Sequence, residues 1–228
     1  MKQVFTLILL LYFSNSFGQF AIVNDKDNVV NVREDGVQNS KVIDKLQNGH
    51  LIYCFENKGD WTNIDYENKG KELNGYVYSN IYKLISSFPA LTISEKSENL
   101  ITLKNDTIEV IISQSKFDKK KHVFKYVKDY TTQIELIDNK RYWGLDGGMP
   151  KTQFEKISIK IGHKYITLPK FALDGLYEPN IYTAEVNYDN VTGTFYIQTM
   201  NSDGAGGYLV MWKIEKGIYK ERFVVHGF

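Results

Sequence analysis

The chain has 228 residues, of which 43% are hydrophobic and 24% charged, a composition typical of a folded protein with one or two domains. Its formal net charge is +1, so it has no surplus of basic residues with which to neutralise nucleic-acid phosphates. We therefore expect no nucleic-acid partner. The 16 tyrosines and 13 phenylalanines favour β-sheet structure.

The first 18 residues have the pattern of a signal peptide. Lys2 precedes an almost continuous apolar stretch over residues 4–13, and the small residues Ser16 and Gly18 follow it. We expect cleavage before Gln19. Because about ten apolar residues are too few to span a bilayer, the sequence predicts a periplasmic or secreted protein with no membrane span after cleavage.

After this segment the chain consists of short apolar runs separated by Gly, Asn and Asp. Such runs, rich in β-branched and aromatic residues, predict strands joined by tight turns. In the first third we expect a hairpin turn at residues 57–60 and a long charged loop over residues 67–74. Cys54 lies within the apolar run 51–55, and as the only cysteine it is expected to be a buried small hydrophobe.

Four spaced motifs give this first third a family resemblance. They are Asn31-Val32-Arg33, Asn48-Gly49, Gly59-Asp60-Trp61 and Gly75-Tyr76-Val77. Residues 21–84 thus resemble a bacterial SH3 (SH3b) domain. The resemblance implies a small barrel over residues 20–86 that binds peptidoglycan or a protein or peptide partner of the cell envelope.

Residues 86–89 are the expected boundary to a second, β-rich domain over residues 89–228. Short alternating runs continue to the C-terminus, ending in a meander over residues 182–188, 194–200, 208–214 and 219–225. No long stretch has the 3.6-residue period of a helix. The predicted fold is therefore mainly β, with an SH3-like small barrel followed by a larger antiparallel domain, either a sandwich or a curved sheet.

Aromatic residues are the candidates for ligand binding on the first domain. Exposed aromatic rings give rigid contact area, and SH3-like grooves are lined by them. Trp61 fits either a groove or the core, whereas the tyrosines are expected to be more exposed. The candidate residues are Tyr53, Trp61, Tyr76 and Tyr78.

Three loops of the second domain combine glycines with acidic residues. They contain Asp146, Asp174 and Glu178, and Asp203. If these carboxylates gather at one rim they would form a calcium site or a polar pocket. Tight turns also use Asp and Gly, and this interpretation is favoured, with Asp203 capping nearby N–H groups. We accordingly expect no metal and no cofactor.

The basic run over residues 116–128 has the composition of a solvated surface. No nucleophile elbow, zinc-protease motif, paired-cysteine metal spacing or P-loop occurs. The leading hypothesis is thus a non-enzymatic envelope protein with an SH3b-like binding module. An immunity or inhibitor protein against a toxin or hydrolase fits the same features, and a hydrolase using Asp146 and Asp203 is a third hypothesis.

Overall fold

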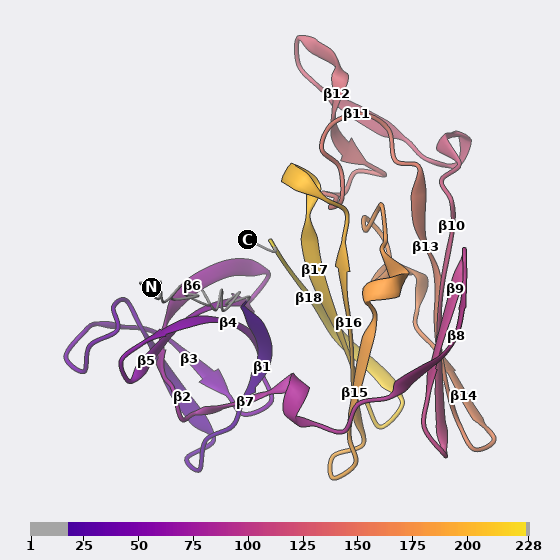
Figure 1. Cartoon of the computed structure of the whole chain (residues 1–228). Coiled ribbons are helices and arrows are strands. Elements are labelled where there is room, and N and C mark those ends of the chain that lie inside the picture. The colour runs from indigo at the N-terminus through magenta and orange to yellow at the C-terminus, as the bar shows by residue number, and fades with distance from the viewer. Residues whose placement is uncertain (1–17, 227–228) are drawn as a thin grey trace, which may run out of the picture.

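The computed structural model describes residues 18–226 and shows a mainly β protein built from antiparallel sheets (Figure 1). The mainly β expectation is therefore confirmed. The predicted signal peptide lies, except for Gly18, outside the described residues. Within residues 18–226 no helix has the length and apolar character needed to cross a membrane.

The N-terminal sheet has seven strands and curls around its own core. Its strands are β1 (Gln19–Val23), β2 (Val29–Arg33), β3 (Val42–Gln47), β4 (Leu51–Lys58), β5 (Trp61–Asn68), β6 (Lys71–Tyr78) and β7 (Tyr82–Leu84). They are ordered β3-β2-β6-β5-β4-β1-β7. The core inside the curl contains Ala21, Val23, Val30, Val32, Leu46, Ile52, Cys54, Ile64, Tyr66, Val77 and Ile81. Cys54 is therefore buried, as expected.

Two tight turns connect the three central strands of this sheet. The β4–β5 turn falls at Gly59 and Asp60, as predicted. Between β5 and β6, Lys69 and Gly70 both have positive φ, the requirement of a type I′ hairpin turn. The predicted loop over residues 67–74 is thus wrong. Those polar residues continue the ladder because backbone pairing does not require apolar side chains.

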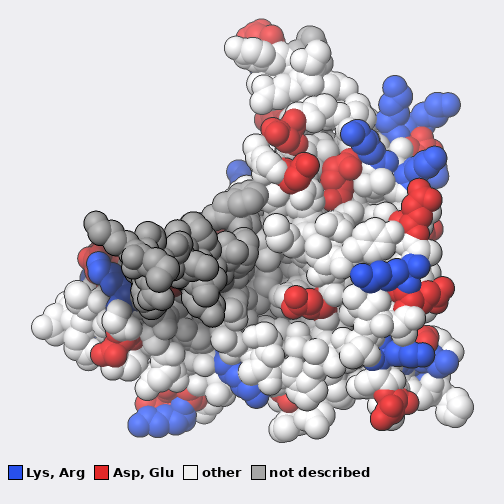
Figure 2. All heavy atoms as spheres, in the orientation of Figure 1, with Lys and Arg blue, Asp and Glu red and all other residues white. Residues whose placement is uncertain are grey.

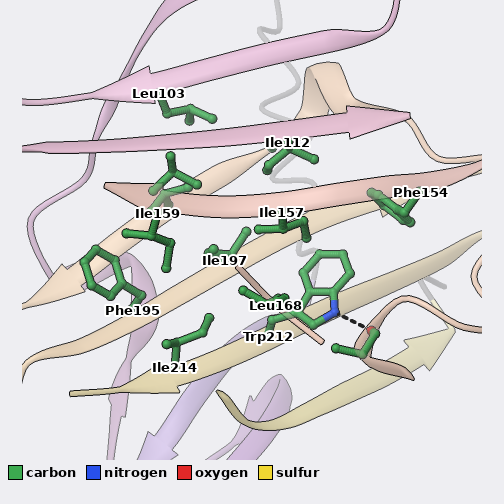
Figure 3. Close-up of a cluster of buried hydrophobic side chains, with 14 of the residues drawn as sticks. Leu103, Ile112, Phe154, Ile157, Ile159, Leu168, Phe195, Ile197, Trp212 and Ile214 are labelled. Atoms are coloured by element: carbon green, nitrogen blue, oxygen red, sulfur yellow. Dashed lines mark hydrogen bonds between the residues drawn. The ribbon is translucent and has the colours of Figure 1, made fainter. Parts of the chain in front are cut away.

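Two further sheets pack face to face in the C-terminal half. One contains β8 (Thr92–Ser97), β9 (Leu100–Lys104), β10 (Ile108–Lys116), β13 (Thr152–Ile161) and β14 (Lys164–Thr167). The other contains β15 (Glu185–Asp189), β16 (Thr194–Asn201), β17 (Tyr208–Glu215) and β18 (Ile218–His226). Aliphatic and aromatic side chains from both sheets fill the space between them (Figure 3). Trp212 lies at the centre, and its indole N–H donates to the Ala172 carbonyl at 2.8 Å.

A separate hairpin projects from the end of this pair of sheets (Figure 1). It consists of β11 (Phe124–Val127) and β12 (Tyr130–Ile137). Short 3-10 turns occupy several connections: η1 (Ile85–Ser87), η2 (Lys119–Lys121), η3 (Lys170–Ala172), η4 (Ile181–Thr183) and η5 (Gly204–Gly206).

The β15–β18 sheet is the middle layer of the molecule, because its other face packs against the N-terminal sheet. The side chains between these two layers, here called the interlayer cluster, are Phe20, Leu51, Tyr53, Ile85, Phe88, Tyr196, Met211, Phe223 and Val225. A hydrogen bond of 2.6 Å from Lys213 Nζ to the Gly49 carbonyl joins the same two layers. The predicted boundary at residues 86–89 lies on the connection that leads from β7 in the N-terminal sheet to β8 in the five-stranded sheet of the C-terminal half.

Candidate functional site

An aromatic pair forms at one end of the β5–β6 hairpin. Trp61 and Tyr78 lie directly opposite each other in the register, and their rings meet edge to face with centroids 5.4 Å apart. Trp61 is half-buried, and Tyr78 is 39% exposed. The nearby charge of Asp60, together with a hydrogen bond to it, raises the pKa of Tyr78. The pair thus presents aromatic surface to solvent while remaining fixed by the strands.

Arg33, the last residue of β2, brings a positive charge to this pair. Its guanidinium carbon is 5.8 Å from the centre of the Trp61 ring, a cation–π distance. Nη1 of Arg33 donates to the Ser40 carbonyl at 2.6 Å, which ties the β2–β3 loop to the site. Within residues 18–226 no carboxylate lies at ion-pairing distance from Arg33. Its charge therefore remains available to a ligand.

These groups line a groove of about 210 Å³, here called the aromatic groove. Its lining residues are Asp25, Val29, Val30, Asn31, Arg33, Gln38, Trp61, Tyr78 and Ile81. Aromatic rings and valine side chains accept apolar groups, and a guanidinium can donate two parallel hydrogen bonds to a carboxylate. This combination suits an extended peptide carrying a carboxylate.

The two other predicted tyrosines lie outside the aromatic groove. Tyr76 is half-buried beneath the β2–β3 loop, where a Cβ on Gly36 would approach its ring to 3.1 Å. Tyr53 is only 2% exposed and belongs to the interlayer cluster. The expectation that Tyr53 is exposed is wrong, because β4 is covered on both faces. Of the four candidate residues, the structure thus brings Trp61 and Tyr78 together, and it adds Arg33, which the sequence analysis did not name as a site residue.

Three of the four predicted loop carboxylates surround one hollow of about 530 Å³. Asp146, Glu178 and Asp203 line it together, and a Cβ on Gly204 would lie 3.6 Å from Asp146 Oδ2. Asp174 lines a different cavity and accepts a 2.6 Å hydrogen bond from Lys140. The alternative in which all four gather at one rim is therefore wrong for Asp174, which lines a separate cavity although it precedes Glu178 by only four residues.

Each carboxylate of this hollow has a distinct environment. Glu178, at φ 49°, accepts from the backbone N–H groups of Lys151 and Thr152 and so closes the loop that carries Asp146. Asp203 makes no side-chain capping bond to η5, contrary to the prediction that it caps nearby N–H groups. In the described part of the chain, no three His, Cys, Asp or Glu side chains are placed to hold a metal ion.

A cavity of about 660 Å³ lies where the projecting hairpin joins β13 and the loop after η3. At its wall His122 Nδ1 is 2.6 Å from Asp138 Oδ2, and the imidazole stacks on Phe117. Burial would raise the pKa of Asp138, but its hydrogen bonds to the Val123 N–H and to His122 lower it overall. Three lysines and three carboxylates line this cavity, so its charges balance. Basic and acidic side chains are likewise interspersed over the C-terminal half on the face seen in Figure 2.

Comparisons with protein-family models, curated proteins and solved structures find no match for this chain. Function must therefore be inferred from the sites themselves. Of these, the aromatic groove brings an edge-to-face aromatic pair together with an arginine that forms no ion pair in the described structure.

Proposed function

We propose that this chain is an exported, non-enzymatic protein of the cell envelope that binds a peptide. In this proposal the N-terminal sheet is an SH3b-like barrel, and its ligand is the peptide part of peptidoglycan or a segment of an envelope protein. The observation that carries the proposal is the aromatic groove, in which Arg33, Trp61 and Tyr78 converge.

The arrangement of the resemblance motifs supports the SH3b-like interpretation. Asn31-Val32-Arg33 lies within β2, Trp61 opens β5, and Gly75-Tyr76-Val77 lies within β6. The order β2-β6-β5 places these three motifs on adjacent strands. In the chain, Arg33 and Val77 are 44 positions apart. In this proposal the chain is cleaved before Gln19, which would leave all of β1 in the mature protein.

The recognition chemistry follows from the groove lining. An extended peptide would place apolar side chains against Trp61 and Tyr78, as aromatic-lined grooves do for peptides in general. A carboxylate of the ligand would pair with the Arg33 guanidinium. Because Arg33 is held by the Ser40 carbonyl and by the Trp61 ring, little side-chain freedom remains to be lost on binding.

Binding of the whole exported chain to purified peptidoglycan and to peptides from an envelope extract tests this proposal. Tyr78→Ser and Arg33→Gln are each expected to weaken binding roughly tenfold or more, since interface aromatic and arginine anchors are worth about 2 kcal/mol. Tyr130→Ser is the matched control, because Tyr130 is an exposed tyrosine on the projecting hairpin. Its binding should equal that of the unmodified chain.

Two results would contradict the proposal. One is equal binding by all three variants. The other is the absence of any peptide or peptidoglycan ligand together with tight capture of a single toxin or hydrolase. That second outcome would support the inhibitor hypothesis instead. Thermal melts of each variant establish that the substitutions leave the sheet folded.

A further inference from the structure

A second recess lies between the N-terminal sheet and the C-terminal half. It has a volume of about 250 Å³ and is lined by β4, β5 and β6 on one side and by Trp143 and β18 on the other. We call it the interlayer cleft. It is below the roughly 300–1,000 Å³ of sites for drug-sized ligands, so its size suits one long side chain.

The charge of the interlayer cleft has one sign. Its described lining includes the carboxylates of Asp65 and Glu72 and no lysine or arginine. Neither carboxylate forms an ion pair with any residue from 18 to 226. Asn74 Nδ2 donates to Asp65 Oδ1 at 2.8 Å, which orients that carboxylate while leaving its charge uncompensated. Anions are therefore disfavoured here, and cations are attracted.

The opposite wall is aromatic and firmly held. Trp143 pairs through its backbone with the segment around Leu176: its N–H donates to the Gly175 carbonyl at 2.8 Å, and its carbonyl accepts from Tyr177 at 3.1 Å. Its ring packs against the core between the two C-terminal sheets and lies 4.6 Å from the His226 ring. Phe55, Tyr66 and Phe223 complete the aromatic lining of the cleft.

Carboxylates facing aromatic rings match an alkylammonium group. The ammonium would pair with the carboxylates and lie against electron-rich ring faces, while its methylene stem would contact apolar surface. An uncharged apolar side chain would partly desolvate these carboxylates without giving them a partner, which is unfavourable. We propose that the interlayer cleft binds the ammonium-bearing side chain of a basic peptide.

This site is separate from the aromatic groove. Asp65 follows Trp61 by four residues along β5, a distance of about 13 Å at the usual rise of a strand. The proposal therefore stands whether or not the aromatic groove binds a peptide.

The indole N–H signals of Trp61 and Trp143 distinguish the two sites in a nuclear magnetic resonance titration of the whole exported chain. The probe is acetyl-Ala-Lys-Ala-amide, with the norleucine analogue as the matched ligand that keeps the stem and lacks the charge. Trp61→Phe and Trp143→Phe assign the two signals. We expect the lysine peptide to shift the Trp143 signal and the norleucine peptide to bind about tenfold more weakly or not at all.

Variants of the acidic wall complete the test. Asp65→Asn combined with Glu72→Gln should weaken lysine-peptide binding about tenfold, and Glu72→Gln alone, at an exposed position, should weaken it partially. Asp106→Asn, in the β9–β10 turn, is the control and should leave binding unchanged. Equal binding of the two peptides, a shift confined to Trp61, or undiminished binding by Glu72→Gln would each overturn the proposal.

Discussion

Gly144 offers the sharpest test of how the wall of the interlayer cleft is held. It has φ +98°, and a Cβ there would overlap the Tyr177 carbonyl oxygen and lie 2.7 Å from its carbonyl carbon. Since both groups belong to the backbone, no side-chain rotation relieves the overlap. Gly144→Ala must therefore push apart the two segments that position Trp143.

The expected magnitude follows from the hydrogen bonds at this point. Separation of the segments breaks the two backbone bonds that pair Trp143 with residues 175–177, and the bond from the Tyr208 hydroxyl to the Tyr177 carbonyl. Each is worth about 1 kcal/mol, and positive φ costs an alanine about 1 kcal/mol more. Gly144→Ala should thus lower the free energy of unfolding by about 4 kcal/mol.

Gly147→Ala is the matched control within the same loop. Gly147 has φ +78°, but no atom lies within 4 Å of the position its Cβ would take. Only the conformational cost of about 1 kcal/mol remains. In urea unfolding with a slope near 2 kcal/mol/M, the midpoints should fall by about 2 M for Gly144→Ala and about 0.5 M for Gly147→Ala. Equal shifts for the two variants would refute the reasoning.

Two further predictions concern the buried layers. Burial raises the pKa of the Cys54 thiol to about 12 from an ordinary value of 9.0. The buried neutral thiol therefore contributes fully to stability below about pH 9, and this contribution is lost as the pH rises towards 12. At pH 8 a disulfide reagent should leave Cys54 unmodified in the folded chain and modify it fully in urea; rapid labelling of the folded chain would contradict its burial. A fragment of residues 19–87 keeps the core inside the curled sheet but exposes Phe20, Leu51 and Tyr53. It should melt cooperatively yet self-associate in gel filtration, and a strictly monomeric fragment would count against the role of the interlayer cluster.

The strands were largely predictable because their signals are local. The turn at Gly59 and Asp60 and the four final strands follow from residues adjacent in the sequence. The burial of Tyr53 was not predictable in this way, since its partners in the interlayer cluster include Tyr196 and Phe223, more than 140 residues further along. A usable signal was the unbroken apolar run from Leu51 to Phe55, which is typical of a strand covered on both faces.

Site residues were harder to predict because they depend on which strands become neighbours. Arg33 reaches Trp61 only because β2 pairs with β6, and no spacing in the sequence encodes that pairing. Conversely, Asp174 and Glu178 are close in sequence, yet the backbone between them turns their carboxylates into different cavities. The charged stretch from Glu67 to Asn74 looked like a loop because the ends of β5 and β6 that it contains place no side chain in the core.

The middle position of the β15–β18 sheet has a consequence for the order in which the protein can fold. Tyr53 and Leu51 are made early, but they are covered by Met211 and Phe223, near the end of the chain. At about 5–20 residues per second, roughly 10–35 s of synthesis separate Tyr53 from Phe223. Until the last strands have been made, Met211 and Phe223 cannot cover this face, so the N-terminal sheet reaches its native packing only after β17 and β18 have emerged.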